Sequence, residues 1–132
     1  KPENIFEEVI MNSLLKRGYE VDAQVGCLSY SIDLCIRDPR DNSRYLLAVE
    51  CDGASYHSSY SARVSDRLRQ QVLENLGWNV FRIWSTDWWR SPNNQLDLLD
   101  QKIKNLIKDN NQSESFKIES NSSEEQKNIF EN

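Results

Sequence analysis

Residues 45–49 form a nearly continuous apolar run, and this run constrains the fold more than any other part of the sequence. A strand that is apolar on both faces is typical of the centre of a sheet covered by other layers on both sides. We therefore expect an α/β fold in which helices flank the sheet on each face. The run ends in the segment Glu50-Cys51-Asp52-Gly53, where charge replaces apolar character abruptly.

Hydrophobic periodicity predicts the order helix, three strands, helix, strand, helix. Asn4 is the expected cap of the first helix, with Glu7 reaching back in the manner of a capping box. The three strands are expected over residues 19–25, 30–37 and 45–49, followed by a helix with the apolar stripe Val64, Leu68, Val72 and Leu76, a strand over 79–84 and a helix opened by Pro92. We expect an antiparallel meander followed by a parallel crossover, giving a mixed sheet of about four strands.

The length of 132 residues suits one domain, which we place at residues 1–108. Residues 109–132 are expected to be an acidic polar tail or linker, since they carry most of the net charge of −5. A nearly neutral domain can still present a local basic face. The three cysteines have no metal-type spacing, which favours a reducing cytoplasmic location, and no apolar run is long enough to predict a membrane span.

Three carboxylates are candidates for one site. Glu50 and Asp52 are two residues apart at a strand end and should point to the same face. Asp33 is the one acid in an alternating strand whose apolar residues Ile32, Leu34 and Ile36 share the other face. If the two strands are neighbours, the three acids converge and need a compensating cation, for which Mg²⁺ or Mn²⁺ is suited. In the alternative interpretation, Asp33 caps a turn and the other two acids pair with Arg67, Arg69 or Arg82.

His57 is the only histidine in the chain, five residues beyond Asp52. On the loop that leaves the acidic strand end, it is placed to act as a general base or acid during hydrolysis. A lone histidine is also commonly structural or simply exposed, and this alternative stays open.

Residues 49–57, 66–69, 76–78 and 82–88 together resemble the PD-(D/E)xK nuclease superfamily. The closer similarity is to the branch of very-short-patch-repair endonucleases, often found as the C-terminal domain of large superfamily 1 helicase-like proteins. The resemblance extends from about residue 6 to about residue 99. It implies a restriction-endonuclease-like three-layer sandwich that cleaves DNA with a divalent metal ion.

By this resemblance, Asp33 and Glu50 are the two acids of the core motif and bind the metal. Asp52 occupies the position where many members carry lysine, so that it would assist as a further metal ligand, while His57 substitutes for the lysine in catalysis. Glu7 matches a further acid on the first helix, with its capping role as the alternative. Gln24 lies in a segment that also looks like a family motif, where polar support of the site is expected.

A basic helix face next to the acids is the expected contact for the phosphate backbone. Its candidate residues are Arg63, Arg67 and Arg69, with Gln24 from the site. A solvated helix face is the alternative, and Arg69 is the best candidate for pairing with an acid of the site. Trp88 and Trp89 are candidates for stacking on bases, with core packing as the alternative, whereas Trp84 is expected in the core.

The leading hypothesis is therefore a metal-dependent DNA endonuclease, with RNA as an alternative substrate, forming the nuclease module of a helicase-like or defence or repair protein. A catalytically inactive nucleic-acid-binding module that positions a helicase is the second hypothesis, because the lysine of the motif is absent. A purely structural domain is the third.

Overall fold

The computed structural model describes residues 1–53, 60–109 and 116–117. The first helix, α1 (Ile5–Lys16), begins as expected, since the side chain of Asn4 accepts a hydrogen bond of 2.9 Å from the Glu7 amide. Glu7 also reaches back, but its Oε1 accepts from the amide of Glu3, one residue before the cap, at 2.9 Å. The helix start is thereby stabilised, and the Glu7 carboxylate is fixed in place.

The sheet has the order β1-β2-β3-β4. Strands β1 (Val21–Cys27), β2 (Tyr30–Asp38) and β3 (Asp41–Asp52) form the antiparallel meander, and β4 (Val80–Trp84) lies parallel to β3. A two-residue strand, β5 (Phe116–Lys117), pairs with the first half of β3. The expected mixed sheet is confirmed, and the apolar run 45–49 does lie in its central strand, where all five residues are buried.

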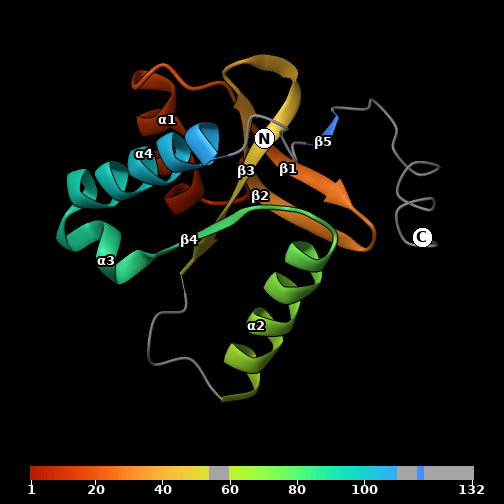
Figure 1. Cartoon of the computed structure of the whole chain (residues 1–132). Coiled ribbons are helices and arrows are strands. Elements are labelled where there is room, and N and C mark those ends of the chain that lie inside the picture. Colours follow the sequence, from red (N-terminus) through yellow and green to blue (C-terminus); the bar gives the residue numbers. More distant parts are fainter. Residues whose placement is uncertain (54–59, 110–115, 118–132) are drawn as a thin grey trace.

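Helices cover both faces of the sheet (Figure 1). On one face, α1 and α4 (Pro92–Asp109) pack a cluster that includes Ile10, Leu14, Leu99 and Ile103. On the other face, α2 (Tyr60–Asn75) contributes Leu73 to a second cluster. The α/β three-layer arrangement predicted from the sequence is confirmed. No helix within the described ranges is long and apolar enough to cross a membrane.

The buried face of α2 differs from the predicted stripe. Leu73 is fully buried, whereas Leu68 is 56 % exposed. The helix runs away from the sheet toward its N-terminal end (Figure 1), and among its described side chains only those of the last turns pack in the apolar core. Apolar periodicity misplaced the inner face because that face also carries Arg69, whose charge interrupts the apolar pattern.

Two further expectations are corrected near the ends of elements. The polar stretch over residues 58–61 favours a loop in the sequence, but it overlaps α2, which already begins at Tyr60; residues 58–59 lie outside the described part. After β4 the chain forms a short helix, α3 (Ser85–Arg90), that the periodicity did not indicate. Trp88 of α3 is buried, while Trp84, predicted to be in the core, is only partly buried.

The corrected face of α2 can be tested by truncating its two leucines separately. Leu73→Ala should lower the free energy of unfolding by about 2–5 kcal/mol, because it leaves a cavity in a packed cluster. Leu68→Ala, on the exposed side, should change it by less than about 0.5 kcal/mol. Urea denaturation of both variants measures the difference. A larger loss of unfolding free energy for Leu68→Ala would support the apolar stripe predicted from the sequence instead.

Candidate active site

Strands β2 and β3 stop pairing in the regular way at Asp33. The last paired residues are Leu34 and Val49. Beyond them, the Asp33 amide donates to Glu50 Oε2 at 3.2 Å, and the Cys51 amide donates to Asp33 Oδ2 at 2.9 Å. Two carboxylates thus accept the hydrogen bonds that backbone carbonyls would accept in a continuing ladder. This exchange fixes both acids at the point where the strands part.

The backbone of β1 is also irregular at Gln24, the residue opposite Asp33. Gln24, which faces Asp33 between two regular pairs, is left out of the pairing and has a positive φ of 53°. Across this interruption, Ile32 packs in the cluster beneath α2, whereas Leu34 packs in the cluster beneath α1 and α4. The expectation that these two residues share one face was therefore wrong, because the pleat is broken between them.

Asp33 approaches the acids of the α1 N-terminus. Side-chain oxygens of Glu3, Glu7 and Asp33 all lie within 4.8 Å of one another. Glu7 is buried at 2 % exposure, and its Oε1 accepts a hydrogen bond of 2.9 Å from Gln24 Nε2. Gln24 in turn accepts from the Ser31 hydroxyl at 2.6 Å. The polar support expected of Gln24 is thus directed at Glu7.

The carboxylates destabilise one another in their ionised form. Burial, and then the negative charge of Glu50, raise the pKa of Asp33 to about 7; Glu7 adds to this effect and the Cys51 amide opposes it. Burial also raises the pKa of Glu50, against the opposing influence of Arg69. The site therefore holds more negative charge than its surroundings compensate.

Arg69 supplies the nearest positive charge to Glu50. Its Nε lies 3.1 Å from Glu50 Oε1, in an ion pair. The same guanidinium donates to the carbonyl of Ser31 and lies 5.6 Å from the centre of the Tyr30 ring. These contacts reach from α2 to the start of β2, so Arg69 both pairs with the acid and links the helix to the sheet.

Asp52 does not join Asp33. It shares the α2 side of the sheet with Glu50, as expected, but its Oδ2 pairs with Arg82 Nη1 at 3.3 Å. A hydrogen bond with Asp52, after the larger effect of burial, raises the pKa of Asp66 on α2. The two acids at the end of β3 thus have different partners. Glu50 lies beside Asp33, whereas Asp52 contacts α2 and β4.

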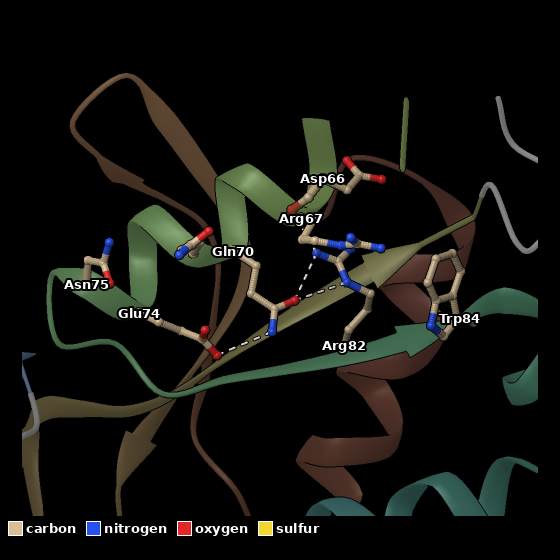
Figure 2. Close-up of a pocket in the computed structure, with 8 residues that line it drawn as sticks. Asp66, Arg67, Gln70, Glu74, Asn75, Arg82 and Trp84 are labelled. Carbon is tan, nitrogen blue, oxygen red and sulfur yellow. Dashed lines mark hydrogen bonds between the residues drawn. The ribbon is translucent and has the colours of Figure 1, made fainter. Parts of the chain in front are cut away.

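The predicted phosphate-binding face of α2 borders a polar groove of about 630 Å³ between α2 and β4 (Figure 2). Arg67 is exposed at this groove, and Arg82 is bound in it by Gln70, whose Oε1 accepts from Nη2 at 3.2 Å. Arg63 belongs to α2, but its side chain is outside the described part of the chain, and so is His57.

The oxygens of Glu3, Glu7 and Asp33 suit a hard divalent cation. Carboxylate oxygens are the ligands that Mg²⁺ and Mn²⁺ prefer, and the unbalanced negative charge on Asp33 is what such an ion would neutralise. Sequence reasoning did not include Glu3 in the site. Its spacing of four residues from Glu7 was the available signal, but Glu3 precedes the helix and no periodicity marked it.

The raised pKa of Asp33 predicts how stability varies with pH in the presence of a chelator. Between the unfolded pKa of about 3.9 and the folded value of about 7, the folded protein retains a proton that the unfolded chain releases. The free energy of unfolding should therefore fall as pH rises through this window. Asp33→Asn cannot ionise, so its stability relative to the parent should be greater at about pH 8 than at about pH 5.

Chemical denaturation at both pH values measures this difference. The matched control is Asp97→Asn, which removes the same charge from a side chain that is 71 % exposed. An equal pH dependence in both variants would contradict the pKa assigned to Asp33.

Comparison with known proteins identifies the family of this domain. No curated protein and no solved structure matches the chain. The family model REase_MTES_1575 matches residues 6–103, which include the whole of the acidic site except Glu3 and extend from α1 into α4. Because this match covers most of the chain, the protein belongs to the REase_MTES_1575 family of restriction-endonuclease-like domains.

Proposed function

We propose that this domain hydrolyses phosphodiester bonds in DNA with Mg²⁺ or Mn²⁺ as its cofactor. The observation that carries the proposal is the position of Asp33, which lies between Glu50 on β3 and the Glu3–Glu7 pair at the start of α1. The acids come from the N-terminal end of α1, from β2 and from β3. A common function for the buried carboxylates explains why the fold tolerates their repulsion.

Asp33, Glu7 and Glu50 are the proposed ligands, with Glu3 at the exposed side of the group. A divalent ion, when bound, polarises the scissile phosphate and lowers the pKa of the attacking water. The protein's own contribution is to hold these oxygens in place before the substrate arrives. The Cys51 amide fixes Asp33, and Gln24 fixes Glu7, so neither acid needs to reorganise.

Arg69 is the proposed positioning residue for Glu50. It places a permanent positive charge 3.1 Å from Oε1, which favours the ionised, ligand-competent form of this carboxylate. Asp52 stands where the resemblance leads one to expect lysine, and its contact with Arg82 gives it a supporting role. Proton transfer by His57 stays a prediction, since that residue lies outside the described part.

Arg67 and Arg63 on α2 are the proposed contacts for the substrate backbone. Arg67 is exposed and borders the groove next to the Glu50 face, so a strand lying along α2 would bring a phosphate toward the acids. The resemblance further leads us to propose that the domain acts in the cytoplasm as the nuclease module of a larger helicase-like protein.

A nucleic-acid-binding module without catalytic activity is the second candidate. The observation that favours it is that Glu50 and Asp52 each already have an arginine partner, which offsets part of their negative charge without a metal ion. The two candidates differ in their requirement for metal. Calorimetric titration with Mn²⁺, followed by a cleavage assay, separates them, because the binding module would hold DNA but would not cut it.

Removal of either central acid should abolish cleavage. Asp33→Ala and Glu50→Ala are each expected to lower the rate of metal-dependent DNA cleavage by at least about 100-fold, since each removes a ligand worth several kcal/mol in the transition state. Calorimetry should show weaker Mn²⁺ binding in the same variants. Near-ultraviolet circular dichroism checks that the fold is retained.

The matched control for this prediction is Asp97→Ala, an acid on α4 that is exposed and distant in sequence from the site. It should cleave at the parental rate. If Asp33→Ala or Glu50→Ala cut as fast as this control, the assignment of the site would be wrong.

The role of Arg67 can be measured through the salt dependence of DNA binding. Loss of one phosphate contact in Arg67→Ala should reduce the slope of log K against log salt by about 0.9 for duplex DNA. Lys108→Ala removes a charge that is also exposed, from the last turn of α4, and should leave the slope unchanged. Identical slopes for Arg67→Ala and the parent would show that Arg67 does not contact the phosphate backbone.

A further inference from the structure

An aromatic pair with one exposed ring joins α3 to the first turn of α1. The rings of Phe6 and Trp89 are 6.3 Å apart between centroids and inclined by 42°. Trp89 is 59 % exposed, although the preceding residue, Trp88, is 1 % exposed. Since α3 is anchored by Trp88, the neighbouring indole is directed outward, and Phe6 supports one side of it.

The position of this pair is fixed relative to the proposed metal ligands. Phe6 is adjacent to Glu7 in α1, so their Cα atoms are about 3.8 Å apart. Glu7 belongs to the group formed with Glu3 and Asp33. On the other side, α3 directly follows β4, whose parallel neighbour β3 carries Glu50. Phe6 and Glu7 both belong to the first turn of α1, so the aromatic pair and these acids lie at the same end of that helix.

The size of the exposed surface indicates what could cover it. Trp89 exposes roughly 150 Å² if a large aromatic side chain offers about 250 Å². Ile5, the other exposed apolar side chain next to Phe6, is 74 % exposed. The exposed areas of Trp89 and Ile5 together are far below the roughly 800 Å² that each partner contributes to a stable protein interface. A single planar ring matches this area better than a protein domain does.

The charges around the aromatic pair also favour an uncharged planar ring as the ligand. Glu3, which precedes α1, and Glu8 in its first turn are exposed close to Phe6 in the sequence and would repel a phosphate group that approached without a cation. A nucleobase is uncharged and stacks on an indole face irrespective of its identity. Arg90 follows Trp89 and is exposed, so it can meet the phosphate attached to a stacked base.

We propose that Trp89, supported by Phe6, stacks on an unpaired base next to the scissile phosphate, so that the preferred substrate is single-stranded DNA or a single-stranded branch. This inference rests on the proposed phosphodiester hydrolysis, because the acids would determine which nucleotide of the strand lies next to the stacking platform, that is, Trp89 with Phe6 behind it. A fully paired duplex keeps its bases stacked on one another and gains nothing from the indole unless a base is first unpaired.

Binding can be tested separately from cleavage. The probes are a fluorescently labelled oligothymidylate and a blunt duplex, titrated by anisotropy with the full chain, once with a chelator and once with Ca²⁺ in place of Mg²⁺. Trp89→Ala should bind the single strand about 5- to 150-fold more weakly. Trp89→Phe should stay within about threefold of the parent, since it keeps an aromatic face. Duplex binding should be unchanged in both variants.

Leu15→Ala is the matched control. Leu15 is also an exposed apolar residue of α1, at 45 %, but lies nine residues from Phe6, about 13 Å along the helix axis. It should bind both probes as the parent does. Equal binding of the single strand by Trp89→Ala and Leu15→Ala would overturn the proposal, as would an equal loss for single strand and duplex or an absence of single-strand binding by the parent.

A parallel cleavage assay with Mg²⁺ distinguishes the two levels of inference. If the parent cuts DNA and Trp89→Ala keeps the parental rate on single strands, the stacking platform is wrong while phosphodiester hydrolysis stands. If the parent does not cut but loses single-strand binding on Trp89→Ala, the platform is supported and the hydrolytic activity is wrong.

Discussion

Two hydrogen bonds at the end of the β2–β3 ladder organise the acidic site. Where regular pairing ends, the carboxylates of Asp33 and Glu50 accept from the backbone amides of Cys51 and Asp33. Buried carboxylates are costly unless hydrogen-bonded or paired, and these bonds offset only part of the cost, as the raised pKa values of both acids indicate. The surrounding elements then add a positive charge from Arg69 and a polar chain through Gln24 and Glu7.

The same constraint accounts for the unusual packing of α2. A helix that covers only apolar residues would present a continuous apolar stripe to the sheet. Here its inner face joins Leu73, which packs in the core, with Arg69, which reaches Glu50. Among the described side chains of α2, apolar packing against the sheet is therefore confined to the last turns. Nearer its start, the helix contacts the sheet through polar groups, and its other side borders the polar groove. Leu68 is exposed as a result of this division.

Local signals in the sequence located most elements correctly. Asn4 caps α1, and Gly77, with φ of 103°, terminates α2, because both depend on the conformational preferences of single residues and their neighbours. The buried central strand was recognisable from its apolar run alone. The helix α3 was missed because it is a single short segment whose one buried side chain, Trp88, leaves no periodic pattern.

The sequence by itself determined the α/β order and the presence of acids at the end of β3, since apolar runs and their charged ends are local features of the pattern. It indicated that Glu50 lies near Asp33 only on the condition that their strands are neighbours. Only the tertiary structure decided that Asp52 pairs with Arg82 while Glu7 and Glu3 approach Asp33. Side chains from α1, β2 and β3 meet through the layering of helices on the sheet, and such distances do not follow from spacing along the chain. The broken pleat at Gln24 completes the arrangement, because its left-handed backbone conformation depends on the strands on which it packs.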